Sequence, residues 1–310
     1  MNMDSLEHPR SVLLIGVPDA GKTNFLSRLW IKLDAGDGIL AKSGLPSDLD
    51  YLNSGADHLL KGEFAPRTPQ DVQDKTEIPV KSTANGEAFS GTLIVPDLPG
   101  EQALSVYRTR QWSTEWETKI REGCGCLLFV RVDSKELIAP LDWINCPAHF
   151  GTSLPSVATE KDADGNEKPP TQVVLVDWLQ FLRRGFTRRV GGNYKPRIGI
   201  VVTAWDLVAN EQKPAGPGAW IASNLPLLSQ FVQTNDCDFE FEYFGVSVAS
   251  GDLDADPEFK TSYLKGDPRK AGEVVHSLSG SPETTHDITL PVAWALGLDG
   301  ATPKGSANPK

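Results

Sequence analysis

The 310-residue chain lacks any apolar run of the roughly 18 residues that a membrane-spanning helix requires, so we expect no membrane span. It also lacks a surplus of positive charge, because 41 acidic residues against 30 basic ones leave a net charge of −11. This balance argues against broad binding to nucleic acid or to anionic lipid. Residues 1–10 lack the apolar segment of a secretory signal, and we therefore expect a cytoplasmic location.

Cysteine is scarce as well, with four residues in the chain. Cys124 and Cys126 are separated by one residue, which is the wrong spacing for the usual C-x₂-C half of a zinc site. They lead into an apolar run, so we expect reduced and mostly buried thiols there. Hydrophobic residues at 39% and charged residues at 23% fit a globular protein with a substantial core.

The most informative segment that is present runs from Gly16 to Thr23 and reads G-x-x-x-x-G-K-[ST], a complete phosphate-binding loop. An apolar run precedes it and apolar residues at helical spacing follow it, which is the strand–loop–helix context that such a loop requires. Backbone N–H groups would bind phosphate, Lys22 would reach the β- and γ-phosphates, and Thr23 would bind Mg²⁺. The residues that we expect to contact the nucleotide here are Gly16, Asp19, Ala20, Gly21, Lys22, Thr23 and Asn24.

A second motif, D-x-x-G, comprises Asp97 and Gly100 at the end of a predicted strand. An Asp in this place would hold Mg²⁺ through water beside Thr23. The Gly three residues later would let its backbone N–H approach the γ-phosphate without a side chain in the way. Such a contact exists only while the γ-phosphate exists, so the motif predicts a nucleotide-dependent switch.

A third element predicts the choice of base. Thr203 and Asp206 end a buried strand as T-x-x-D. One carboxylate accepts both the N1–H and the N2 amine of guanine, and adenine offers no such donor pair, so Asp206 favours guanine. The next predicted strand ends in a small-residue turn at Ser247 and Val248, whose backbone N–H groups would reach the guanine O6.

The order of apolar segments predicts an α/β fold in three layers, with a mostly parallel six-stranded sheet and one antiparallel edge strand. The Asn-Gly turn at 85–86 indicates that the second and third strands form a hairpin. The predicted strands are 11–16, 77–82, 89–97, 126–132, 197–202 and 240–246, and the predicted helices are 22–34, 47–61, 101–119, 174–185, 217–233 and 289–297. We expect one domain over 9–299, insertions at about 35–75, 134–170 and 251–285, and a disordered tail at 300–310.

The four motifs, on the first, third, fifth and sixth strands, resemble those of the TRAFAC class of P-loop GTPases, the Ras-like and translation-factor-related proteins. The spacing, the T-A-W-D variant and the helix that follows His286-Asp287-Ile288-Thr289 look most like the bacterial double-GTPase family. This resemblance implies a Ras-like GTPase fold with Mg²⁺ and GTP or GDP as ligands. It also implies a protein partner, a second GTPase or an effector, in a bacterial conflict or defence system.

Two positions depart from the family pattern. The usual N-K-x-D is Thr203-Ala204-Trp205-Asp206 here, so the lysine stem that packs on the base is absent. Trp205 either offers an apolar surface in its place or faces the core, and we favour the core. Ras-like enzymes orient the attacking water with a Gln immediately after the D-x-x-G glycine, and this chain has Glu101 there. We therefore expect slow hydrolysis that depends on another protein.

The switch threonine that would complete the Mg²⁺ shell lies between the first helix and the second strand. We favour Thr68, which precedes Pro69 in an extended loop, over Thr76. The predicted catalytic residues are Lys22, Thr68, Gly100 and Glu101, and the predicted metal ligands are Thr23, Thr68 and Asp97. An arginine finger would come from Arg67, Arg108 or Arg110, unless these are ordinary surface residues.

Three functions remain open at this point. The first is a GTP-binding molecular switch that hydrolyses GTP with Mg²⁺. The second is a GTPase-like interaction module that binds nucleotide and scarcely hydrolyses it. The third is an ATPase or a nucleotide kinase, which would leave Asp206 without a role.

Overall fold

The protein was analysed as a computed structural model. It describes residues 10–66, 76–83, 89–95, 106–112, 114, 117–118, 120, 123, 125–134, 137–138, 169–186 and 195–298. Within these residues, no helix combines the length and the apolar character needed to cross a bilayer.

The described strands form one nine-stranded sheet in the order β2-β3-β4-β1-β5-β6-β7-β8-β9. Their bounds are β1 Arg10–Gly16, β2 Leu40–Lys42, β3 Thr76–Ser82, β4 Ser90–Val95, β5 Gly125–Arg131, β6 Arg197–Thr203, β7 Glu240–Ser247, β8 Glu273–His276 and β9 Glu283–Thr285. The five central strands pair in parallel. Two strands joined by antiparallel pairing flank them at each edge.

All six predicted strands are present, as β1, β3, β4, β5, β6 and β7, and the antiparallel pairing of β3 with β4 confirms the predicted hairpin. The prediction of six strands with one antiparallel edge strand was wrong. The sheet has nine strands and antiparallel pairs at both edges. The three strands that were missed contain only three or four residues each, too few for an alternating pattern to emerge from the sequence.

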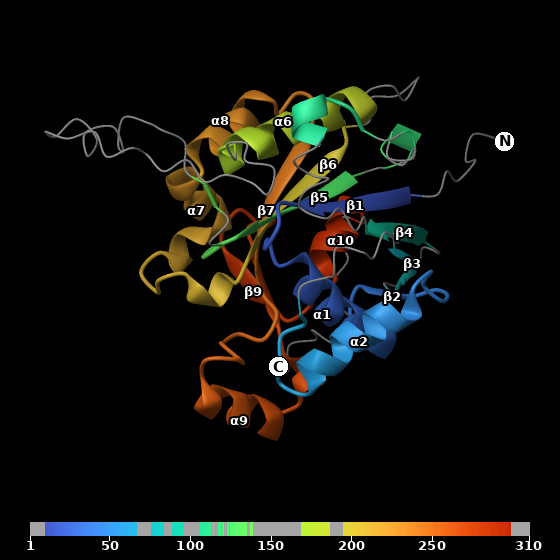
Figure 1. Cartoon of the computed structure of the whole chain (residues 1–310), viewed down its shortest axis with the longest axis vertical. Helices are drawn as coiled ribbons and strands as arrows, with labels where there is room; N and C mark the ends of the chain where they lie inside the picture. Colours follow the sequence, from blue (N-terminus) through green and yellow to red (C-terminus); the bar gives the residue numbers. More distant parts are fainter. Residues whose placement is uncertain are drawn as a thin grey trace, which may run out of the picture.

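The helices cover both faces of the sheet (Figure 1): α6, α7 and α8 lie on one face, and α1 and α10 lie on the other, with α2 packed outside α1. This arrangement confirms the predicted three layers. The bounds are α1 Lys22–Ala35, α2 Leu49–Leu60, α6 Thr171–Phe186, α7 Gly216–Asn224, α8 Pro226–Thr234, α9 Pro257–Lys265 and α10 Leu290–Ala295, with 3₁₀ segments η1 Trp205–Leu207, η2 Lys213–Ala215 and η3 Pro268–Lys270.

One predicted helix, 217–233, is two helices in the structure. The break falls at Leu225, because Pro226 has no backbone N–H to donate and disfavours helical backbone at the residue before it. In the described part of the predicted helix 101–119, residues 106–109, 114 and 117–118 are helical, whereas 110–112 are not. Most of 134–170 and the tail 300–310 lie outside the described residues.

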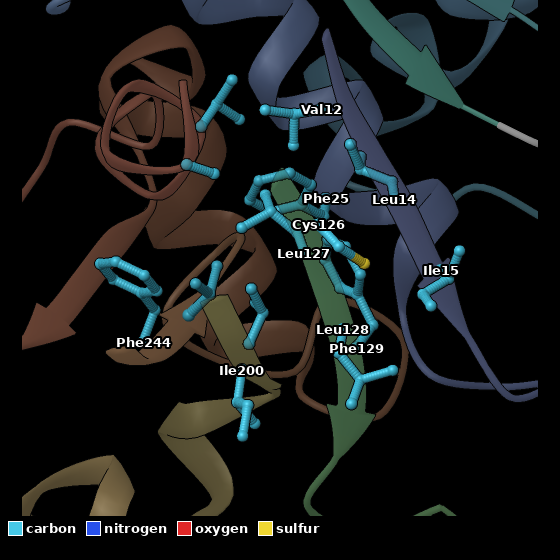
Figure 2. Packing of buried hydrophobic residues seen from close by; sticks show 14 of the residues in the cluster. Val12, Leu14, Ile15, Phe25, Cys126, Leu127, Leu128, Phe129, Ile200 and Phe244 are labelled. Atoms are coloured by element: carbon cyan, nitrogen blue, oxygen red, sulfur yellow. The ribbon is translucent and has the colours of Figure 1, made fainter. Parts of the chain in front are cut away.

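The core lies between the central strands and the helices on either face. Figure 2 shows side chains of β1, β5 and β6 packed together with Phe25 of α1. The rings of Phe25 and Phe129 meet edge to face, with centroids 5.0 Å apart. Cys126 is a free, buried thiol, and burial raises its pKa well above the ordinary value. This confirms the expectation for Cys126, whereas Cys124 lies outside the described residues.

The segment 251–285, expected to be a loop-like insertion, carries α9, η3, β8 and β9. Its helix α9 begins at Asp256, whose carboxylate accepts hydrogen bonds from the N–H groups of Glu258 and Phe259 and so caps the helix. The strands β8 and β9 then extend the sheet beyond β7. The segment is therefore an integral part of this edge of the sheet.

The sequence His286–Thr289 joins the end of this segment to the other side of the sheet. Asp287 is 4% exposed, and its carboxylate accepts hydrogen bonds from Ile39 N at 2.7 Å and from the N and Oγ1 atoms of Thr289 at 2.9 and 2.6 Å. Thr289 Oγ1 in turn accepts from Leu40 N at 3.2 Å. Position 38 has no room for a side chain, because a Cβ on Gly38 would lie 2.6 Å from Asp287 Oδ1. Asp287 thus anchors α10 to β2.

We predict that Asp287→Ala lowers the free energy of unfolding by about 3 kcal/mol, because it leaves buried N–H donors without an acceptor. Chemical denaturation measures this loss. The control is Asp236→Ala, which removes an exposed carboxylate and should change stability by less than about 0.5 kcal/mol. Equal stabilities of the two variants would contradict the anchoring role.

Candidate nucleotide-binding site

Two glycines of the loop between β1 and α1 are required by close packing. Gly16 pairs with Phe129 of β5, and a Cβ on Gly16 would lie 2.8 Å from Phe129 Cβ. Gly21 has a φ of +80°, and a Cβ there would lie 2.7 Å from Thr203 Oγ1. Asp19 also adopts left-handed backbone, with a φ of 62°. The loop is therefore a compact turn pressed against the carboxyl ends of β5 and β6.

The N-terminus of α1 faces this turn without a side-chain cap. Its N-cap residue is Gly21, and its first turn holds no acidic residue, whereas α2 and α9 are capped by Asp48 and Asp256. The N–H groups of an uncapped first turn attract an anion. Lys22 lies over the same turn, where its Nζ donates to the carbonyl oxygens of Gly16 at 2.7 Å and Val17 at 3.3 Å.

Thr203, predicted to contact nucleotide, is bonded to the phosphate loop. Its hydroxyl is buried and lies 2.9 Å from the Ala20 carbonyl oxygen and 3.3 Å from that of Val130. The side chain also fills the space beside Gly21. Thr203 therefore fixes the end of β6 to the phosphate loop, and Asp206 follows three residues later.

The turn after Thr203 brings Asp206 to the surface and Trp205 to the core. Ala204 has a φ of 55°, and η1 begins at the next residue. Trp205 is 1% exposed and packs so closely on Gly245 that a Cβ there would lie 2.5 Å from its ring. This confirms that Trp205 faces the core. Asp206 is half-buried, and its backbone carbonyl accepts from Lys213 Nζ at 3.1 Å.

Ser247 and Val248 lie at the carboxyl end of β7, the strand next to β6. Ser247 is completely buried, and its hydroxyl is one of the few buried polar side-chain groups of the described residues that have no hydrogen-bond partner. The carbonyl of Val248 accepts a hydrogen bond from Arg28 of α1 at 2.7 Å. The predicted base-contacting turn is thus adjacent to Asp206 and contains an unsatisfied hydroxyl.

Arg131, at the end of β5, is a charged residue of this site that the sequence analysis missed. Its Nε donates to Asp133 at 2.7 Å, and its Nη1 lies 3.8 Å from Asp19 of the phosphate loop. Burial lowers the pKa of Arg131, but the hydrogen bond and charge of Asp133, followed by the charges of Asp19 and Asp206, outweigh it and raise the pKa. The sequence did hold a signal for Arg131, because it is a charged residue at the carboxyl end of an otherwise apolar strand.

Asn24, predicted to contact the nucleotide, accepts a hydrogen bond on its Oδ1 from Ala65 N at 2.9 Å. The chain just before Thr68 is thereby held beside the start of α1. Thr76, the alternative switch residue, is 3% exposed and pairs with Val95 within the sheet. The predicted residues Thr68, Asp97, Gly100 and Glu101 lie outside the described residues.

The candidate arginine fingers Arg67, Arg108 and Arg110 differ in their surroundings. Arg110 forms an ion pair with Asp177 of α6, and its guanidinium lies 5.1 Å from the centre of the Tyr107 ring. This engagement gives it a structural role. Arg108 is exposed, and Arg67 lies outside the described residues.

The described residues fit a nucleotide in two respects. The phosphate loop has its glycines where the backbone must pass closely, and Lys22 lies over the loop. Of the three predicted Mg²⁺ ligands, Thr23 alone lies in the described part of the chain, in the first turn of α1. The arrangement can hold a polyphosphate at one end and a base beside Asp206 at the other.

Solved structures and a family model match most of the chain. The chain is similar to the signal recognition particle receptor SRb-GTP/SRX complex from Chaetomium thermophilum, with 18% identity over 82% of this chain and 97% of that chain and a TM-score of 0.37. It is also similar to Methanosarcina barkeri Roco2 RocCORdC bound to GDP, with 14% identity over 85% and 50% of the two chains and a TM-score of 0.31. No curated protein sequence matches. A family model described as Double-GTPase 1 matches residues 13–295, and the chain therefore belongs to the Double-GTPase 1 family.

Proposed function

We propose that the chain is a GTP-binding molecular switch that hydrolyses GTP with Mg²⁺. One observation carries the proposal: the hydroxyl of Thr203 bonds to the Ala20 carbonyl and so fixes the strand that leads to Asp206 against the phosphate loop. This contact supports a single site that combines phosphate binding with a carboxylate suited to guanine. Membership of a GTPase family supports the same conclusion.

Each residue then has a defined task. The loop amides and Lys22 hold the phosphates, Asp206 accepts the two guanine donors, and the turn at Ser247 and Val248 faces the guanine O6. Thr23, with Asp97 and Thr68, would hold Mg²⁺, which when bound neutralises charge on the phosphates. Hydrolysis then rests on positioning and charge stabilisation rather than on covalent chemistry.

Thr68 is favoured over Thr76 as the switch residue. The Asn24–Ala65 hydrogen bond tethers the chain three residues before Thr68 to the residue next to Thr23. Three residues span at most about 10 Å, so this tether would allow Thr68 to reach the proposed metal site. Thr76 is instead fixed in β3 with its side chain buried.

We further propose that residues 9–299 act as one GTPase domain, with insertions at about 35–75, 134–170 and 251–285, in the bacterial cytoplasm and beside a partner GTPase in a defence system. The alternative is an interaction module that binds GTP and scarcely hydrolyses it. Glu101 favours this alternative, because a carboxylate repels the γ-phosphate. Both proposals require GTP binding.

The base assignment is tested with Asp206→Asn. Xanthine carries a carbonyl where guanine has the N2 amine, so an amide that offers both a donor and an acceptor should prefer it. We expect the affinity for GTP to fall about 10- to 100-fold and the affinity for XTP to rise, as measured by calorimetry. Asp236→Asn, an exposed residue near the opposite end of β6, should change neither value. Equal affinities of the unaltered chain for GTP and ATP would disprove guanine selectivity.

Single-turnover hydrolysis separates the switch from the module. With the protein in excess over GTP and Mg²⁺ present, we expect slow release of phosphate from the unaltered chain. Glu101→Gln removes a negative charge and supplies a water-orienting amide, and we expect it to accelerate release about 10-fold. A chain that keeps GTP intact both as the unaltered protein and as this variant, with and without candidate partners, would be an interaction module.

A further inference from the structure

Arg28 is a buried cation in the middle of α1, with 1% of its surface exposed. Its Nε donates to the Val248 carbonyl at 2.7 Å, its Nη2 donates to Tyr263 Oη at 2.6 Å, and its Nη1 donates to the Pro268 carbonyl. All three acceptors are uncharged. In the part of the chain that the structure describes, no carboxylate pairs with Arg28.

These contacts join the turn after β7 to the segment that carries α9 and η3, residues Pro257–Lys270. Tyr263 belongs to α9 and Pro268 to η3, and Tyr263 Oη also donates to the Leu59 carbonyl of α2 at 3.0 Å. Figure 1 shows α9 at the lower end of the molecule, below α1 and α2. Arg28 thus lies where α1, α2, the α9–η3 segment and the turn at 247–249 meet.

The chain that leaves this segment closes over the arginine stem. Gly272 has a φ of +98°, and a Cβ on it would lie 3.3 Å from Arg28 Cδ and 3.4 Å from the Ser247 carbonyl oxygen. Any side chain here would press on both the arginine and the turn. Arg28 is therefore enclosed by the α9–η3 segment and the residues that follow it.

The bond to Val248 fixes more than one carbonyl. A trans peptide is planar, so its C=O and its N–H point in opposite directions. Holding the Val248 carbonyl toward Arg28 therefore directs the N–H of Ala249 away from α1. This N–H directly follows the turn at Ser247 and Val248 that the proposed function assigns to the guanine O6, so the Val248–Ala249 peptide sets how that turn ends.

Stability alone does not account for a buried arginine here. Removing a guanidinium from water costs several kcal/mol, and no buried counter-charge among the described residues offsets this cost. An apolar side chain of similar length often serves the core equally well or better. The guanidinium does provide donors in fixed directions, which an apolar side chain lacks.

We propose that Arg28 is a positioning residue for the guanine-contacting turn, and that the α9–η3 segment sets nucleotide affinity by holding Arg28 in place. The inference rests on the proposed function, since it assumes that this turn meets the base. It adds a control point for nucleotide release within the 251–285 segment.

The main test is Arg28→Met, which keeps the length of the side chain and removes its donors. We expect GDP to dissociate about 10-fold faster, as measured by displacement of a fluorescent GDP analogue. Arg28→Lys should not restore the slow rate, because a single ammonium does not reproduce the fork that reaches three acceptors. Arg269→Met is the matched control, since it removes an exposed arginine of η3 and should leave dissociation unchanged.

A second readout separates positioning from general loosening. In 6-thio-GDP a sulfur, a weak acceptor, replaces the guanine O6, while the N1–H and N2 donors for Asp206 remain. If Arg28 orients the turn, Arg28→Met should reduce the preference for GDP over 6-thio-GDP. The preference for GDP over IDP, which reports the Asp206 contact through the N2 amine, should stay the same. If Arg28 had a purely structural role, Arg28→Met would reduce the affinities for GDP, 6-thio-GDP and IDP by the same factor.

Tyr263→Phe serves if Arg28→Met does not fold. It removes one hydroxyl that bonds to both Arg28 and Leu59, and we expect GDP to dissociate about three-fold faster. Unaltered protein that binds no guanine nucleotide would overturn the proposed function, and this inference with it. Two outcomes would overturn this inference alone, provided that the unaltered protein binds GDP. Both variants could release GDP at the normal rate, or Arg28→Met could leave the preference for GDP over 6-thio-GDP unchanged.

Discussion

The contact between Thr203 and the phosphate loop sets the geometry of the whole site. The hydroxyl of Thr203 bonds to the carbonyl of Ala20, and its side chain excludes a Cβ at Gly21. The loop follows β1, whereas Thr203 ends β6, and β5 lies between these two strands. Without this contact, Asp206 would be tied to the phosphate loop only through the sheet. This bond therefore fixes how far Asp206 lies from the phosphate loop, because Asp206 follows three residues after Thr203.

The sequence was sufficient for most features with a local signal, although the helix break at Pro226 was missed. The strand–loop–helix pattern around Gly16, the Asn-Gly hairpin and the apolar runs of the central strands all predicted elements that the structure contains. The buried position of Trp205 was predicted as well. These features depend on residues close together in the chain, whose periodicity and turn chemistry determine the backbone directly. The short edge strands β2, β8 and β9 escaped because their formation depends on a neighbouring strand rather than on their own pattern.

The polar contacts that hold the site together could not be predicted in this way, because their partners lie far apart in the chain. Arg28 meets acceptors at 248, 263 and 268, and Asp287 meets the N–H of Ile39. The sequence does hold a partial signal for Arg28, which lies three residues after Phe25 and so on the buried face of α1. That spacing predicts burial of the arginine, but it does not identify the groups that would satisfy it.

Where the family pattern has N-K-x-D, this chain uses residues of two neighbouring strands. On β6, Thr203 supplies the hydroxyl that binds the phosphate loop, and the lysine position is Ala204, with a φ of 55°. On β5, Arg131 pairs in register with Thr203, and its Nη1 lies 3.8 Å from Asp19 of the phosphate loop. The charges of Asp19 and Asp206 both help to raise the pKa of Arg131, so adjacent strands bring a positive charge near both carboxylates, although the lysine stem is absent. The residue type at a motif position matters less here than the place that the sheet gives to its functional group.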